Sequence, residues 1–151
     1  MRRPESEPSA IVRVVAWLLL GPSILVAAGL MVKGYADVGD GFGAGVIVSL
    51  AIAVLYIAFG TAGAETALPT LRYAPATAIA GLLLALACGF FPVALGGPPV
   101  THQPRPGEHV IKIGTLELFT PFVFDVGIFL LVVGVLTVLV HQLAHREEDF
   151  G

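Results

Sequence analysis

Asp125 is the only formal charge in the apolar segment 118–140, and it lies close to the middle of that segment. As a helix the segment measures roughly 34 Å, which is long enough to cross a bilayer. A carboxylate at that depth costs about 3 kcal/mol on insertion scales, so it should face protein or a water-filled cavity. Because intramembrane carboxylates usually mark ion or proton routes, we predict that Asp125 belongs to an ion pathway. The alternative is a structural hydrogen bond to another helix.

The composition places the rest of the chain in the membrane as well. Hydrophobic residues make up 56% of the 151 residues and charged residues 13%, whereas a soluble domain usually carries about 25% charged residues. Three further uncharged runs, 14–32, 41–64 and 74–100, are long enough to span a bilayer and too long for barrel strands. We predict an all-α integral membrane protein, a single domain over 1–151 with transmembrane helices at about 11–32, 42–61, 75–95 and 119–141.

The same counts argue against several other classes of protein. A net charge of −3 without a basic stripe gives no indication of nucleic-acid binding. The single cysteine, Cys88, lies inside an apolar run, which excludes a disulfide framework and a thiolate metal cluster. No nucleophile motif, phosphate-binding loop or facing pair of haem ligands is present. We therefore expect no catalytic residues, no cofactor and no enzyme activity.

Lysine and arginine are distributed unevenly between the two sides of such a bundle. The N-terminus, the second loop and the C-terminus lie on one side and carry five of these residues: Arg2, Arg3, Arg13, Arg72 and Arg146. The first and third loops lie on the other side and carry three: Lys33, Arg105 and Lys112. Because cytoplasmic loops are enriched in these residues, both termini are predicted to lie in the cytoplasm, with the chain in the cell membrane.

Small residues follow one another along the start of the second predicted helix. Gly41, Gly45 and Ser49 recur every four residues, a ridge that allows a neighbouring helix to approach closely. Helix packing is the preferred interpretation, over direct contact with an ion. Asp37 and Asp40 come just before this helix. They either cap its N-terminus or form an acidic mouth through which cations enter, and the sequence does not separate the two.

The fourth predicted helix has two different faces. At about 100° per residue, Gly127 and Gly134 nearly superpose, while Asp125 lies roughly 160–180° from both. One face thus offers a glycine seam for close packing and the other a carboxylate, which leaves little room for lipid and suggests burial within a larger complex. Pro121, four residues before Asp125, is expected to remove a helix donor and loosen that turn.

The remaining polar residues near the helix ends are expected to play simpler parts. His141 and His145 have the i, i+4 spacing of a metal face, but no third ligand is evident, and a helix C-terminus favours cations. We therefore expect interface or capping roles for them and no metal site. Glu65, just past the second helix, is expected to face solvent.

Two blocks of sequence resemble the MnhB-type domain of multi-subunit Mrp sodium/proton antiporters. The first, at 38–45, reads Val-Gly-Asp-Gly-Phe-Gly-Ala-Gly, where that family has roughly Pro-Gly-Gly-Gly-Phe-x-Gly-Gly. The second, at 124–134, combines Phe-Asp-Val-Gly-Ile with a later Val-Val-Gly, as in the last helix of the family. The chain departs from the pattern at Val38 and Asp40, which makes the mouth more acidic. With the order of blocks and the number of spans, the resemblance covers nearly the whole chain.

The resemblance implies a non-catalytic membrane component that works beside the other Mrp-type antiporter subunits in a hetero-oligomer, in contact with membrane lipid. It implies exchange of Na⁺ for H⁺, with Asp125 at the position of the family's intramembrane acid. An alternative is a structural component in the ion-translocating arm of a membrane-bound hydrogenase-type or other complex I-like redox complex. A small homo-oligomeric cation channel ranks last, because the chain lacks a polar stripe to line a pore.

Overall fold

The computed structural model describes residues 10–34, 40–94, 96–97, 112–113, 116–117 and 120–150. The long elements are four α-helices: α1 (Ala10–Gly34), α2 (Gly41–Ala67), α3 (Ala74–Ala94) and α4 (Thr120–Phe150). A short 3₁₀ helix, η1 (Pro69–Tyr73), joins α2 to α3. Between α3 and α4, the two-residue strands β1 (Lys112–Ile113) and β2 (Leu116–Glu117) pair antiparallel.

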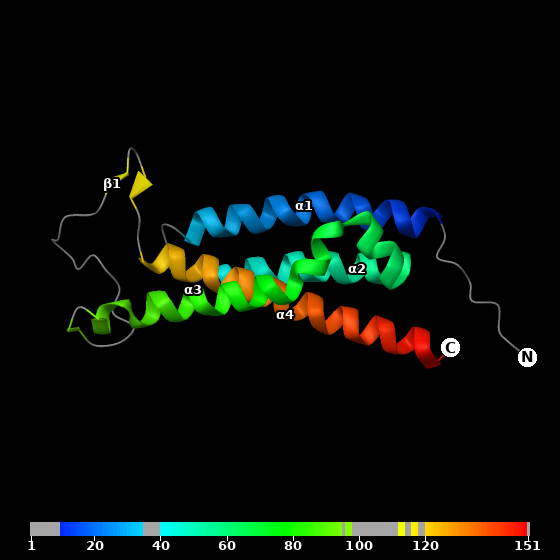
Figure 1. The fold of residues 1–151 in the computed structure, drawn as a ribbon. Helices are drawn as coiled ribbons and strands as arrows, with labels where there is room; N and C mark the ends of the chain where they lie inside the picture. The colour runs from blue at the N-terminus through cyan, green and yellow to red at the C-terminus, as the bar shows by residue number, and fades with distance from the viewer. Residues whose placement is uncertain are drawn as a thin grey trace, which may run out of the picture.

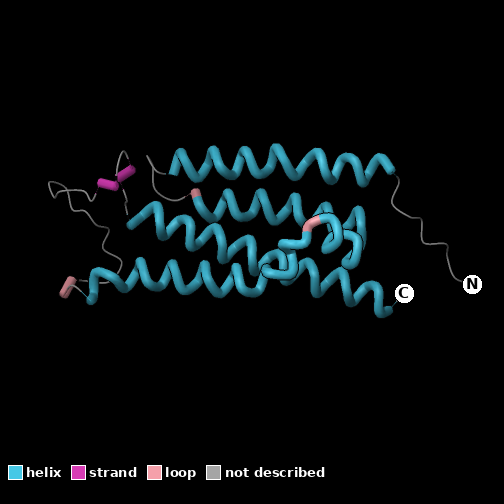
Figure 2. The backbone as a smooth tube through the Cα atoms, turned by 45° about the horizontal axis from the view of Figure 1, so that its top comes forward, coloured by secondary structure: helices cyan, strands magenta, loops and turns pink. Residues whose placement is uncertain are grey.

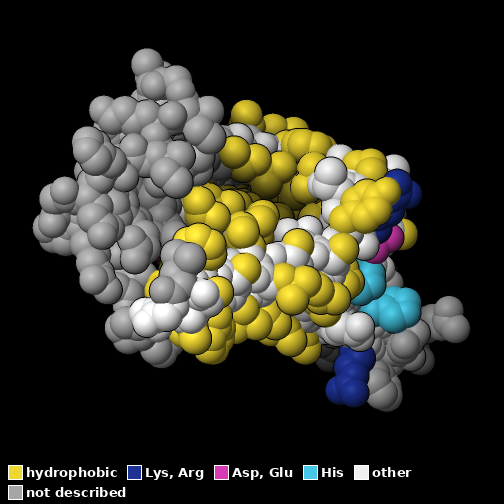
Figure 3. Space-filling model, turned by 60° about the vertical axis from the view of Figure 1, so that its left-hand side comes forward, with side chains coloured by type: hydrophobic (Ala, Val, Ile, Leu, Met, Phe, Trp, Pro, Cys, Tyr) yellow, Lys and Arg dark blue, Asp and Glu magenta, His cyan; other side chains and the backbone are white. Residues whose placement is uncertain are grey.

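The predicted fold class is confirmed: all four α-helices are long and apolar enough to cross a membrane. Large apolar side chains point outward from them, among them Ile11, Leu25 and Ile57. Figure 3 shows one such face, on which hydrophobic side chains cover the described helices and the charged and histidine side chains gather at one end. An outward-facing apolar surface suits lipid or protein neighbours rather than water. The chain is a multi-pass membrane protein.

The helices pack in the order α1, α2, α4, α3, so that α4 lies between α2 and α3. Helix α1 packs mainly on α2, and the views in Figures 1 and 2 agree on this arrangement. The start of α1 and the end of α4 lie at the same end of the bundle (Figure 1). Helices α2 and α4 are each covered from two sides by helices of the same chain, so both can hold a polar group away from lipid.

Helix α2 is broken at Gly60, which has φ 69° and ψ 179°. That backbone region is open essentially to glycine alone. The chain then turns back along the bundle, so that α3 starts part-way along it (Figures 1 and 2). Hydropathy predicts an end for this helix at about 61, whereas helical structure continues after the break to Ala67. We call the segment after the break, 61–67, the return leg.

Candidate functional site

Asp125 is buried within this chain, at 6% exposure. It lies on α4 where the first residue of α2 crosses it: a Cβ added at Gly41 would overlap the backbone carbonyl oxygen of Asp125. Glycine at position 41 therefore lets the two backbones meet beside the acid. The shielding that we expected from a larger complex is thus supplied at this position by the chain's own second helix.

Helix α4 is longer than the sequence predicts. It runs from Thr120 to Phe150 rather than ending near 141, so Asp125 lies in its second turn. The part of the helix that is long and apolar enough to span a membrane is Phe122–Arg146. Asp125 lies in the N-terminal part of that candidate span, roughly 13 Å along the axis from its middle at about 1.5 Å per residue.

Pro121 does not interrupt α4. It lies in the first turn, one residue after the helix begins at Thr120. The first backbone N–H groups of a helix have no partner inside the helix, so proline removes no hydrogen bond there. The expected loosening of the turn before Asp125 is therefore wrong, and the acid stands on regular helix.

The contact between α2 and α4 runs along the predicted ridge of small residues. A Cβ at Gly45 would lie 2.9 Å from Val132 Cβ and 3.2 Å from the Phe129 carbonyl oxygen. Ser49 is buried, and its hydroxyl donates to the Gly45 carbonyl oxygen at 2.7 Å. This internal hydrogen bond satisfies the hydroxyl within its own helix. The ridge is therefore occupied by helix packing over this stretch.

The opposite face of α4 packs on α3 through its glycines. A Cβ at Gly127 would lie 2.8 Å from the Ala85 backbone nitrogen, and one at Gly134 would lie 2.7 Å from the Ala74 carbonyl oxygen. Gly81 of α3 completes this seam, because a Cβ there would come within 2.6 Å of the Gly127 carbonyl oxygen. Our sequence reasoning missed Gly81. A signal was present in the small residues of α3, which recur on one helical face: Ala74, Ala78, Gly81 and Ala85.

Of the two acids before α2, the structure describes only Asp40; Asp37 lies outside the described residues. Asp40 holds the N-cap position, but its side chain makes no capping hydrogen bond. Its carboxylate instead lies 3.8 Å from Lys33 Nζ at the end of α1, with the side chains 37% and 69% exposed. A pair this exposed is weak. It nevertheless places a positive charge next to one of the two acids of the suggested mouth.

A second polar cluster lies at the other end of α4, where α2 breaks. His141 Nδ1 lies 3.4 Å from the Tyr56 hydroxyl and 3.4 Å from Glu65 Oε1. The His145 ring stacks on the His141 ring at 6.2 Å between centroids. Glu65 lies within α2 rather than past its end; its side chain is 43% exposed to solvent, and its carboxylate also lies beside His141. Tyr56, buried at 3% exposure, was missed. Within the described residues, no group of three or more His, Cys, Asp and Glu side chains is placed to hold a metal ion.

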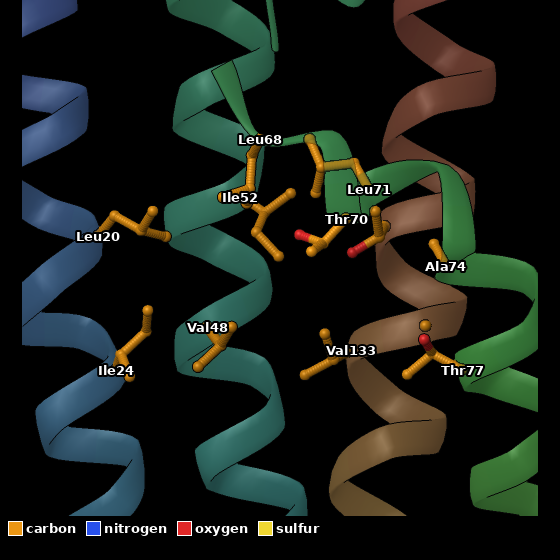
Figure 4. Close-up of a pocket in the computed structure, with 12 residues that line it drawn as sticks. Leu20, Ile24, Val48, Ile52, Leu68, Thr70, Leu71, Ala74, Thr77 and Val133 are labelled. Carbon is orange, nitrogen blue, oxygen red and sulfur yellow. The ribbon is translucent and has the colours of Figure 1, made fainter. Parts of the chain in front are cut away.

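An open cavity of about 300 Å³ lies between the helices, apart from both polar clusters. Figure 4 shows its walls, which come from every helix: Leu20 and Ile24, Val48 and Ile52, Thr70 and Leu71, Thr77, and Val133. Thr137 of α4 also lines it, and the Thr137 hydroxyl is buried without a hydrogen-bond partner among the described residues. No lining residue is ionisable. Asp125 is not among the residues that line the cavity.

Comparison with known proteins gives consistent matches over most of the chain. Residues 11–138 match the family described as "Domain related to MnhB subunit of Na+/H+ antiporter". The B subunit of the Na⁺/H⁺ antiporter of Bacillus subtilis (strain 168) is 33% identical over 119 residues, covering 78% of this chain and 80% of that protein. The protein of the same name from Alkalihalophilus pseudofirmus (strain ATCC BAA-2126 / JCM 17055 / OF4) is 30% identical over 139 residues, covering 92% and 90%.

A third relative shows the same domain in a longer chain. The A/B subunit of a probable K⁺/H⁺ antiporter of Rhizobium meliloti (strain 1021) is 31% identical over 124 residues, covering 82% of this chain but 12% of that protein. The matched residues include the ridge of small residues on α2, the glycine seam between α3 and α4, Asp125 and the break at Gly60. The chain therefore belongs to the family of domains related to the MnhB subunit of Na⁺/H⁺ antiporters.

Proposed function

We propose that this chain is the non-catalytic MnhB-type subunit of a multi-subunit antiporter that exchanges a monovalent cation, Na⁺, for protons. Asp125 contributes to the ion pathway, and the glycine seams contribute to assembly. The observation that carries the proposal is a carboxylate residue buried where α2 and α4 cross, in a chain whose relatives are named antiporter subunits.

The chemistry of exchange follows from the low dielectric around such a group. In a low-dielectric setting a carboxylate is able to bind either a proton or a cation, because each offsets its negative charge. The two ligands compete for the same oxygens, and one leaves as the other binds. Its position in the second turn of α4, beside the first residue of α2, places it near one end of both helices. No covalent chemistry is involved, and the chain needs no cofactor for this role.

Other antiporter subunits are the proposed partners, with lipid around the remaining apolar surface. Helices α1 and α3 are the elements most open to such neighbours, because each packs mainly on one other helix and leaves large apolar side chains exposed. Both termini are proposed to be cytoplasmic in the cell membrane, from the distribution of lysine and arginine. An arm component of a redox complex is not favoured, because the relatives named above are antiporter subunits.

The acidic mouth at Asp37 and Asp40 is a weaker part of the proposal. Exposed acids raise the local concentration of cations at low salt. Lys33 offsets part of that effect at Asp40. We therefore assign the mouth an influence on cation affinity rather than on the maximal exchange rate.

The test is reconstitution of the complex in vesicles with and without this chain. With the chain present, an inward sodium gradient should drive proton efflux, read by a pH-sensitive dye inside the vesicles. Complexes purified without it, at matched amounts of the remaining subunits, should lose exchange. Undiminished exchange from complexes that demonstrably lack this chain would refute the proposal.

A further inference from the structure

The cluster at the break of α2 has a geometry that the proposed role of Asp125 does not use. His141 Nδ1 lies at 3.4 Å from the Tyr56 hydroxyl and at 3.4 Å from Glu65 Oε1. Tyr56 precedes the break at Gly60, and Glu65 belongs to the return leg that follows it. A single nitrogen of α4 is thus placed between the two parts of the broken helix.

The protonation state of that nitrogen decides which part it binds. In the neutral tautomer that carries its proton on Nε2, Nδ1 has a lone pair and accepts a hydrogen bond from the Tyr56 hydroxyl. With a proton, the imidazolium donates from Nδ1, and a carboxylate is its stronger acceptor. Glu65 then becomes the preferred partner. Uptake of one proton from water therefore exchanges a bond to the first part of α2 for an ion pair to the return leg.

Several other charged groups belong to the helices around His141. Helix α1 contributes Arg13, whose guanidinium lies 5.7 Å from the centre of the Phe59 ring. Helix α4 contributes the stacked His145 and the exposed Arg146. In η1, Arg72 donates to the Tyr73 hydroxyl at 2.6 Å. Among the described interactions, Glu65 is the acid that pairs with His141.

We propose that His141 is a proton-binding site of this protein, and that its proton ties the return leg of α2 to α4. The ligand is H⁺ itself, which a histidine side chain can bind and release. The return leg leads through η1 into α3. The site therefore links proton binding to the position of a whole membrane helix. It lies near the opposite end of α4 from Asp125 and does not depend on the role of that acid.

Hydrogen–deuterium exchange of the intact complex tests this directly. Amides of the return leg should be more protected at pH 5.5 than at pH 8.5, after correction for intrinsic exchange, because the ion pair forms only when His141 carries its proton. His141→Gln should abolish the pH dependence. The matched control is His145→Gln, on the same helix one turn later, which should retain it. A pH dependence that persists in His141→Gln, or that is lost only in His145→Gln, overturns the proposal.

Two further variants keep the test valid if His141→Gln does not assemble. Glu65→Gln removes the partner of the protonated form, so the pH dependence of protection should be lost, as in His141→Gln. Tyr56→Phe leaves the ion pair in place, so the protection at pH 5.5 should persist. An unchanged pH dependence in Glu65→Gln, or its loss in Tyr56→Phe, contradicts the proposal. Because amide exchange does not report transport, this result is distinct from a failure of the antiporter function.

Discussion

Asp125→Asn should reduce sodium–proton exchange by roughly tenfold or more, which corresponds to at least about 1.4 kcal/mol in the barrier. Asparagine has nearly the same shape but neither carries negative charge nor takes up a proton at ordinary pH. The contact with the Gly41 backbone involves the main chain of residue 125, so the substitution leaves the α2–α4 crossing in place. Dye-reported proton efflux from vesicles, normalised to the amount of complex, measures the loss.

Two companion variants make the result specific to position 125. Asp125→Glu keeps the ionisable group and should retain part of the exchange. Asp40→Asn makes the same chemical change at an exposed acid paired with Lys33, and should leave the maximal rate close to that of wild type. Wild-type exchange by Asp125→Asn at normal levels of the chain would remove the acid from the ion pathway.

Gly134→Leu should prevent assembly rather than alter ion affinity. A Cβ at this position already overlaps the backbone of Ala78, and backbone cannot move aside as a side chain can. Overpacking of this kind costs about 1–3 kcal/mol, enough to lower the ratio of folded to unfolded protein by roughly fivefold or more. Native gels of membranes from cells that express the variant measure the assembled complex.

The matched control for Gly134→Leu is Gly89→Leu on α3. A Cβ at Gly89 meets nothing within 4 Å, so the same substitution fits there without moving a neighbouring helix of this chain. Gly89→Leu should therefore assemble at near-normal levels unless another protein of the complex covers that position. A normal yield of complex with Gly134→Leu would show that the α3–α4 contact tolerates separation.

Periodicity and composition were enough to predict the membrane helices, because the bilayer requires long apolar segments whose backbone is internally bonded. They also placed Asp125 opposite Gly127 and Gly134, which follows from helical geometry alone. The break at Gly60 was not predicted, because one glycine in an apolar run permits a reversal without requiring it. The course of the return leg depends on packing between distant helices, which has no local signal.

The end cluster escaped prediction for a related reason. Tyr56, Glu65 and His141 are close only because α2 breaks and α4 passes beside it, and their separation along the chain gives no periodic pattern. The C-terminal end of α4 was placed too early, because hydropathy marks where a segment becomes polar, whereas α4 continues as helix to Phe150. Hydropathy locates the ends of a helix poorly.

The most direct measurement of the central claim is sodium protection of Asp125 against a carbodiimide that modifies protonated carboxyl groups in apolar surroundings. The purified complex is treated with the reagent in sodium chloride or in choline chloride at equal ionic strength, and modification of Asp125 is followed by mass spectrometry. If sodium and protons compete for this carboxylate, sodium slows its modification and choline does not. Equal rates of modification in the two salts would contradict the assignment of Asp125 to the ion pathway.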